Sequence, residues 1–520
     1  MSAALWIYGL PACVGVALAL LLGLPARDTR TKLQPLAFLG WSWCLGVFAT
    51  GVATFGWLGW IGQRVGAPDP TDQAGPAQVV PTAGGEGLGT PWAVRAVLLV
   101  VLLAASWAVR ARSRTLQLDD ASTAPRREGS GLEGLAFALC TTFAFVTAVL
   151  RLLHGTLRPI VEDDEANFWA LKAQMLFVKG GFSEAFGALA QEPRLYNADY
   201  PLFNPLLQVW SFANAGELTH VANRVPIQLF GLALLGVLTP ALFRVARPGL
   251  AGLLLVVCAS LAEVSSQLQR GHGDLMVALG ALVACDAWLR WHASRERVWL
   301  RLAGFGLAFL VWSKNEGLLV LVALVGAALL VSLLRRLAAL LSERTAERGG
   351  DLARGPSGTG LASAWPWALF PGAVVLLSRT VNAHFGWKSG FLQNDLREGT
   401  ILDLLRSQFA ERIGPVLSYY WHELALAPAF SGGLLLLLAG LWLCAPRRLA
   451  ASPLAVVSLT AGIVYVGHML VFIGAPHDLT WHLTTAAQRI GFQPLPAVTL
   501  IVAAAFPVAF PALGPAHSRE

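Results

Sequence analysis

Residues 454–474 read LAVVSLTAGIVYVGHMLVFIG, a run without a single Asp, Glu, Lys or Arg. A helix of about 20 apolar residues crosses the ~30 Å hydrocarbon core of a bilayer, so this run predicts a membrane span. Runs of the same kind recur along the 520 residues, of which 55% are hydrophobic and 13% charged, with a mean hydropathy of +0.59. Soluble domains carry about 25% charged residues. The sequence therefore predicts an all-α polytopic membrane protein.

Apolar runs predict about thirteen transmembrane helices. The run 298–334 is divided in two, because Lys314, Asn315 and Glu316 interrupt it and charged side chains are costly at the bilayer centre. The first run is interpreted as a span and not as a cleaved signal peptide, since no basic segment precedes it. The predicted spans are 4–24, 36–62, 91–109, 133–154, 224–243, 249–267, 274–292, 298–313, 317–334, 365–384, 424–444, 454–474 and 492–511.

Arginine and lysine gather in alternate loops, and this pattern orients the predicted helices. Cytoplasmic loops carry an excess of basic residues, which predicts an external N-terminus and a cytoplasmic tail at 512–520. The basic loops also account for the net charge of +7 without a nucleic-acid partner. The predicted inner loops include Arg30, Arg112, Arg244, Arg295, Arg335 and Arg447.

Composition divides the chain further. Residues 1–132 form an N-terminal extension of three predicted spans, and 133–511 form the core, with a large outer loop at 155–223. Pro/Gly-rich residues 66–90 and polar residues 342–362 are typical of linkers. The six cysteines stand singly in apolar runs, so the sequence predicts neither a zinc site nor a disulfide framework.

The face opposite the basic loops has a different chemistry. Several separate loops bring acids, histidines and aromatic residues there, which indicates a site at one membrane face. These segments are 161–165, Asp199-Tyr200-Pro201, 270–274, 314–316, 384–388 and 477–489.

Residues 161–176 of that face read VEDDEANFWALKAQML and combine four adjacent acids with an apolar run. Phe168, Leu171, Met175 and Val178 recur at helical spacing, which predicts an amphipathic helix over 166–178 in the headgroup layer. Two interpretations of the acids remain open. Asp163 or Asp164 caps the helix and suits its dipole, or the acids face a substrate or a metal ion. Four adjacent carboxylates repel one another, so the pKa of at least one is expected to rise.

A carboxylate at the lipid–water boundary can deprotonate a hydroxyl nucleophile or hold a divalent cation. An anionic leaving group needs positive charge, which Lys314, Arg270 or Arg489 can supply. Structural alternatives stay open as well, with Lys314 as an interfacial anchor and Asp274 as a helix cap. The histidines lack the close spacing of a metal site, so the cofactor stays unknown, with a divalent metal ion as one option.

Several segments together resemble the GT-C glycosyltransferases, a family that includes protein O-mannosyltransferases and bacterial aminoarabinose transferases. Asp164-Glu165 before an amphipathic helix is similar to the acidic pair of their first large outer loop. The segment that closes the outer loop, two turns and the C-terminal segment also resemble that family, which extends the likeness over about 133–511. These are Tyr200-Pro201-Leu202 followed by Trp210, Gly273-Asp274, Lys314-Asn315-Glu316-Gly317, and Trp481-His482 followed by Arg489 and Pro494. Asn167 departs from the pattern, because aminoarabinose-transferase relatives carry Arg there.

The resemblance implies sugar transfer from a polyprenyl-phosphate donor to a hydroxyl of a lipid, glycan or protein. It implies a multi-pass protein of the bacterial inner membrane with its site on the periplasmic face. Asp164 would be the general base, and Asp163 or Glu165 would assist it or bind a metal. The implied donor-phosphate residues are Lys314, Arg489 and Arg270, and the implied substrate-binding residues are Asp274, Tyr200, Glu316 and His482.

Two other classes of function remain open. A transporter or lipid flippase would use the charged face as an outward vestibule and would need polar groups across the whole bilayer. The interiors of the predicted spans contain almost no charged residues, with Glu263 and Asp286 as the chief exceptions. An inactive relative or assembly protein would keep the fold and tolerate loss of the acids.

Overall fold

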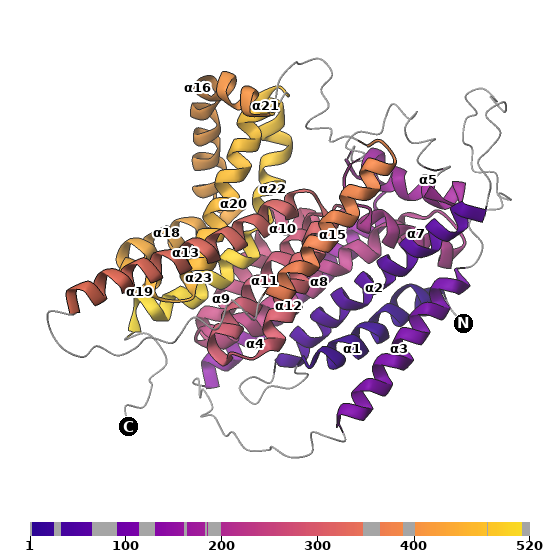
Figure 1. Ribbon diagram of the computed structural model, residues 1–520, viewed down its shortest axis with the longest axis horizontal. Coiled ribbons are helices and arrows are strands. Elements are labelled where there is room, and N and C mark those ends of the chain that lie inside the picture. The colour runs from indigo at the N-terminus through magenta and orange to yellow at the C-terminus, as the bar shows by residue number, and fades with distance from the viewer. Residues whose placement is uncertain are drawn as a thin grey trace.

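The computed structural model describes residues 3–24, 33–64, 91–113, 131–160, 164–182, 185, 199–346, 365–387, 401–475 and 477–511, and every regular element within them is a helix (Figure 1). Elements labelled η are π-helical. The first half of the chain contains η1 Leu5–Gly9, α1 Leu10–Leu22, α2 Gln34–Arg64, α3 Trp92–Ser113, α4 Gly131–Leu157, η2 Glu165–Ala170, α5 Leu171–Lys179, α7 Phe203–Ala215, α8 His220–Val245, α9 Pro248–Ser260 and α10 Ala262–Gln267. The second half contains α11 Asp274–Ser294, α12 Arg297–Ser313, α13 Glu316–Ala346, α15 Trp365–His384, α16 Ile401–Tyr419, η3 Tyr420–Ala425, α17 Pro428–Ser431, α18 Leu434–Cys444, α19 Pro446–Ala451, α20 Leu454–Gly474, α21 Leu479–His482, η4 Leu483–Ala487, α22 Gln488–Phe492 and α23 Leu495–Ala509.

Helix length and composition confirm a multi-pass helical membrane protein. Within the described residues, 8 helices are long and apolar enough to cross a membrane, or 9 if the bent pair Leu479–Phe492 and Leu495–Ala509 is one span. The lipid-facing character is plain on α4, of whose apolar window only 17% is buried. Leu135, Leu139 and Leu150 on this helix are all more than half exposed, as expected where lipid replaces a protein partner.

The predicted number of thirteen spans is not confirmed. The predicted span 249–267 breaks at Leu261, whose extended backbone (φ −60°, ψ 139°) separates α9 from α10. The predicted span 424–444 is divided into η3, α17 and α18. Extended backbone at Ala427 separates η3 from α17. Gly432 and Gly433 separate α17 from α18, because both adopt positive φ angles (56° and 78°), which glycine alone reaches at no steric cost. The α12 helix has 17 residues, below the length of the eight candidate spans, and α15 ends in a polar turn.

The core is built around α11, which packs against α12, α8 and α23. Of the apolar window of α11, 89% is buried, against 83% for α8. The predicted N-terminal extension also contacts this core, since α2 packs against α7 and α8. Figure 1 shows α1, α2 and α3 side by side along one edge. Small residues allow the close α1–α2 crossing, where a Cβ on Gly15 would lie 1.7 Å from the carbonyl oxygen of Ser42.

The predicted amphipathic helix forms as η2 followed by α5, but its buried face differs from the predicted one. Phe168, Lys172 and Leu176 are buried, whereas Val178 is 38% exposed. A π-helical turn contains more residues than an α-helical turn, so η2 shifts the helical phase away from a simple 3.6-residue period. The π-turn therefore explains why the apolar spacing did not predict the buried face.

The predicted outer loop and the region after α15 contain further helices. Within the former, α7 is buried along nearly its whole length. After α15, α16 stands beside α20 and rises with it away from the other helices (Figure 1). Arg412 of α16 donates to the carbonyl oxygens of Phe472, Ala475 and His477 at the end of α20. Asp163, the linker 66–90, residues 347–362 of the second linker and the tail 512–520 lie outside the described residues.

Candidate active site

Asp274 contacts three polar side chains at one end of the core. It opens α11, and its side chain is 1% exposed. Its Oδ1 accepts hydrogen bonds from Lys314 Nζ at 2.9 Å and from Gln493 Nε2 at 2.7 Å. Its Oδ2 lies 3.8 Å from Arg489 Nε. Asp274 thus joins α11 to the α12–α13 turn and to the α22–α23 bend.

Lys314 bridges two acids. It follows the last residue of α12 with an extended backbone, and its Nζ lies 2.9 Å from both Asp274 Oδ1 and Glu316 Oε1. Burial alone would lower the pKa of Lys314, but the two carboxylates hold it above its ordinary value. Glu316 is 15% exposed and accepts a hydrogen bond from Tyr200 Oη at 3.2 Å. The Tyr200 ring packs edge-on against Phe168 at 4.8 Å between centroids.

Backbone and side-chain contacts fix the segment that carries Tyr200. Asn315 donates to Asp199 Oδ2 at 2.8 Å, and Asn382 of α15 donates to the Asp199 carbonyl at 2.7 Å. The fully buried Lys172 donates to the Tyr200 carbonyl at 3.4 Å. Burial lowers the pKa of Lys172 to about 7, although Asp199 opposes this shift. The buried side of η2–α5 therefore contacts the segment that carries Tyr200 and holds it in place.

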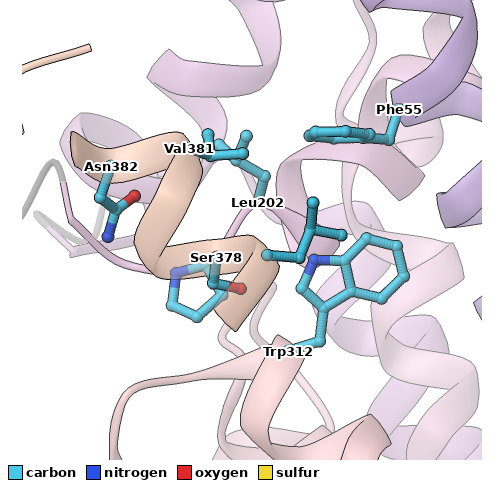
Figure 2. A pocket seen from close by; sticks show the side chains of 8 residues that line it. Phe55, Leu202, Trp312, Ser378, Val381 and Asn382 are labelled. Atoms are coloured by element: carbon cyan, nitrogen blue, oxygen red, sulfur yellow. The ribbon is translucent and has the colours of Figure 1, made fainter. Parts of the chain in front are cut away.

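A small crevice adjoins this segment (Figure 2). Its walls come from α2, α12, α15 and the turn after Tyr200, and most of its lining atoms are apolar. The lining residues are Phe55, Pro201, Leu202, Trp312, Leu377, Ser378, Val381 and Asn382. An apolar crevice thus lies beside the charged residues.

Asp164 and Arg489 form an ion pair between Oδ2 of the acid and Nη1 of the arginine. Their side chains are 28% and 20% exposed, more than those of Asp274, Lys314 or Glu316. Asp164 occupies the N-cap position of η2 but makes no capping hydrogen bond to the described part of that helix. The side chain of Asp164 therefore does not cap η2, and the other predicted cap, Asp163, lies outside the described residues. We call Asp164, Asp274, Lys314, Glu316 and Arg489 the Asp274 cluster.

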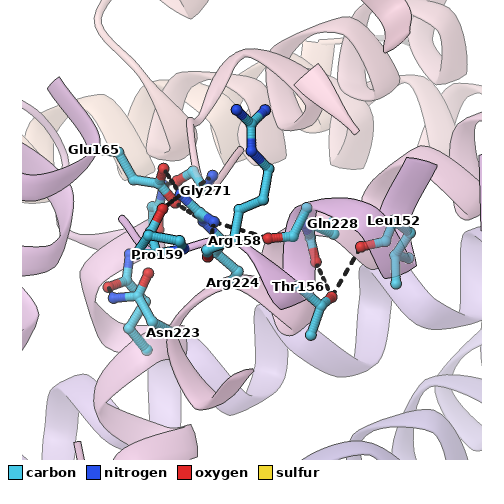
Figure 3. Close-up of polar contacts among 12 residues, drawn as sticks. Leu152, Thr156, Arg158, Pro159, Glu165, Asn223, Arg224, Gln228 and Gly271 are labelled. Carbon is cyan, nitrogen blue, oxygen red and sulfur yellow. Dashed lines mark hydrogen bonds and ion pairs between the residues drawn. The ribbon is translucent and has the colours of Figure 1, made fainter. Parts of the chain in front are cut away.

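Glu165 belongs to a separate buried pair with Arg224 (Figure 3). Both carboxylate oxygens accept from Arg224, through Nε and Nη2 at 2.5 Å, and Oε1 also accepts from the Gly271 amide at 2.9 Å. Arg224 further donates to the carbonyl oxygens of Gly155, Arg158 and Pro159. This pair ties the residue next to Asp164 to the turn that leads into Asp274. It therefore sets the relative position of the two acids.

The contacts above connect six of the predicted site residues, and the other described ones make contacts of their own. Asp164, Asp274, Lys314, Glu316, Arg489 and Tyr200 are connected by the contacts above. Arg270 is half-buried in the turn before α11, where its charge acts on His272. His482 lies against Phe472 and His477, with ring centroids 4.6 and 5.3 Å away.

Sequence reasoning missed Arg224, Gln493 and Lys172 as supporting residues. Arg224 stood at the edge of a predicted span, where an arginine is typical of an interfacial anchor. Gln493 sits four residues after Arg489, a spacing that places both on one helical face. A lysine on an amphipathic helix is normally expected on the solvated side.

The predicted metal ligands are described only in part, because Asp163 lies outside the described residues. No group of three or more His, Cys, Asp or Glu side chains within the part of the chain that the structure describes is placed to hold a metal ion. Burial lowers the pKa of His272 to about 3, so this residue is neutral near pH 7 and adds no positive charge to the site.

No family model, no curated protein and no solved structure matches the chain.

Proposed function

We propose that this protein transfers a sugar from a polyprenyl-phosphate-linked donor to a hydroxyl acceptor. The observation that carries this proposal is the Asp274 cluster, in which three carboxylates and two cations from distant segments meet and only the Asp164–Arg489 pair is substantially exposed. A partly exposed acid beside a partly exposed guanidinium offers a base and an anion site. The sequence resemblance to GT-C enzymes supports the same reading.

The chemistry follows from these positions. The acceptor hydroxyl attacks the anomeric carbon, and its proton passes to Asp164. As the new carbon–oxygen bond forms, the bond between that carbon and the phosphate oxygen breaks, and the lipid phosphate leaves with the electron pair. Arg489 contacts the leaving phosphate, and the positive charge of buried Lys314 further stabilises the negative charge that develops there.

In this proposal Glu316 and Tyr200 bind sugar hydroxyls, which is supported by their partial exposure and the hydrogen bond that joins them. The acceptor is a lipid, glycan or protein hydroxyl.

The second candidate function is transport, and the interior of α11 argues against a transport path. A polar path across the bilayer would have to pass the helices of the core. Between Asp274 and Asp286, α11 carries only apolar residues, and almost all of them are buried. The Asp286 carboxylate at the other end is enclosed by Arg244 and Arg290 and is fully buried.

The proposal includes a topology of thirteen spans with the site on the periplasmic face of a bacterial inner membrane. A reporter fused after residue 520 should then be cytoplasmic. A periplasmic signal from that fusion would overturn the orientation. Reporters inserted at 66–90 and 342–362 should report opposite sides.

The test of sugar transfer uses membranes that contain the wild-type protein, Asp164→Asn or the control Asp478→Asn. A panel of radiolabelled polyprenyl-phosphate sugars is supplied, and label is followed into lipid, glycan and protein fractions. Asp478 caps α21 through the Trp481 amide, and Asn caps about as well as Asp. We expect transfer by the wild type and the control and its loss in Asp164→Asn. Full transfer by Asp164→Asn would remove the proposed base.

A further inference from the structure

Arg489 lies between Asp164 and Asp274 and contacts the two acids differently. Nη1 pairs with Asp164, and Nε lies 3.8 Å from Asp274 Oδ2. Gln493, one helical turn further on, donates to the same Asp274 carboxylate at 2.7 Å. The segment that carries Arg489 is therefore anchored on its buried side by Asp274. On the solvent side, the ion pair with Asp164 holds Arg489.

The two acids differ in how readily they can be displaced. Asp274 is 1% exposed, and its Oδ1 is occupied by Lys314 and Gln493. Asp164 is 28% exposed and precedes the first residue of η2. A ligand that approaches from solvent reaches the Asp164–Arg489 pair before it reaches Asp274. The pair is the part of the cluster that can open without breaking the buried contacts.

The proposed function assigns incompatible tasks to this pair. A carboxylate paired with a guanidinium has a low affinity for protons, so it is a poor general base. A guanidinium that binds a phosphoryl group uses parallel N–H donors, and Arg489 cannot direct the same donor to Asp164 and to a phosphate at once.

We propose that a phosphoryl ligand and Asp164 compete for Arg489. On this inference, which rests on the proposed function for the identity of the ligand as the donor phosphate, binding of the phosphate takes the guanidinium from Asp164. The released carboxylate then becomes competent to accept a proton. Asp274 and Gln493 keep Arg489 in place during the exchange. The base is therefore active only when the donor is bound, and an acceptor or water that arrives first is not deprotonated.

The test measures binding and does not depend on sugar transfer. Inorganic phosphate and a short-chain isoprenyl phosphate are titrated into the purified full-length protein, as wild type, Asp164→Asn, Arg489→Gln and the double variant. Because Asp164→Asn removes the competitor, it should tighten binding of both probes by roughly tenfold, within the usual range of coupling between linked sites. Arg489→Gln should weaken binding, and in that background Asp164→Asn should have no further effect.

General electrostatics makes a different prediction, which the double variant exposes. If Asp164 merely repels anions, Asp164→Asn tightens binding equally with and without Arg489, and the inference is overturned. Unchanged or weaker binding by Asp164→Asn overturns it as well. Glu316→Gln is the matched control, because it removes a carboxylate of the same cluster that pairs with Lys314 and not with Arg489. It should tighten binding less than Asp164→Asn does.

Two further arms keep the outcomes distinct. If Arg489→Gln does not fold, Arg489→Lys retains the charge without the paired donors, and the effect of Asp164→Asn should shrink in that background. Tighter binding of isoprenyl phosphate than of inorganic phosphate identifies the lipid-linked ligand, and equal binding identifies phosphate alone as the competitor. Competition without transfer from any donor would support the exchange and reject sugar transfer. Transfer without competition would do the reverse.

Discussion

Asp274 and Asp286 lie on the same helix, α11, and their surroundings differ. They are twelve positions apart, which is about 18 Å along the axis of an α-helix. Asp286 is fully buried between Arg244 and Arg290, at 2.6 and 2.8 Å. We call these three residues the Asp286 cluster.

Charge and access distinguish the two clusters. The Asp286 cluster combines one carboxylate with two guanidinium groups, for a formal charge of +1. Arg290 also lies over the rings of Trp41 and Trp299. The Asp274 cluster combines three carboxylates with two cations, for a formal charge of −1, and its Asp164–Arg489 pair is exposed. Both clusters join helices. In the Asp286 cluster the carboxylate is fully buried and one guanidinium, Arg244, is partly exposed, whereas the Asp274 cluster exposes both members of the Asp164–Arg489 pair in part.

The largest effect is expected when either buried acid is removed. Asp274→Ala and Asp286→Ala each strand buried cations, and breaking such a pair costs about 3–5 kcal/mol of unfolding free energy. Only Asp274→Ala should also abolish transfer per folded molecule. Unfolding in detergent and transfer normalised to folded protein measure the two effects. Equal loss of transfer in both variants would contradict the distinction between the clusters.

A change at Glu165 sharpens the comparison, because this residue ties the segment of Asp164 to the turn before Asp274 without reacting itself. Glu165→Gln leaves the buried Arg224 charge without its counter-charge and should cost about 3 kcal/mol. Phosphate binding by the folded fraction should persist, since Arg489 is untouched. Loss of that binding in fully folded protein would show that Glu165 acts in ligand binding directly.

Buried Lys172 is expected to make the stability of the protein depend on pH. The folded protein releases the proton of Lys172 at a pKa of about 7, whereas an unfolded chain holds a lysine proton up to about pH 10.4. The unfolded state therefore binds more protons in this window, so stability rises as the pH rises from about 7 towards 10. The unfolding temperature of the wild type should increase between pH 7 and pH 9 more than that of Lys172→Met. An equal increase in both would show that Lys172 is not the titrating group.

The smallest effect is expected from Tyr200→Phe. This change removes one hydrogen bond to Glu316, worth about 1 kcal/mol, and keeps the ring contacts with Phe168. A proposed role in sugar binding predicts a several-fold rise in KM for the donor with little change in unfolding temperature. A change in unfolding temperature with KM unaltered would assign Tyr200 to structure alone.

Much of the site was visible in the sequence, because charged residues are rare in this chain and stand out. Asp164, Asp274, Lys314 and Glu316 were all marked by their position at the ends of apolar runs. The separate environments of Asp164 and Glu165 were not visible. Adjacent residues point in different directions on a helix, and one of these acids meets Arg489 while the other meets Arg224.

Helix phase and helix breaks were predicted least well. The π-turn at η2 changes which side of α5 is buried, and it leaves no signature in the apolar spacing. The break at Leu261 and the Gly432–Gly433 turn lie within runs apolar enough to be read as continuous spans. Amphipathic α16 was missed because its charged residues hide it from a search for apolar runs.

The sequence by itself determined that the chain is helical and embedded in a membrane, since 13% charged residues and repeated apolar runs leave no other stable environment. It also determined which rare charged residues gather at one predicted face. Only the tertiary structure decided how these charges pair. Asp164 and Arg489 are 325 positions apart, and Gln493 reaches Asp274 across 219 positions. Burial removes water as the alternative partner, so each charge takes the counter-charge that helix packing brings within reach.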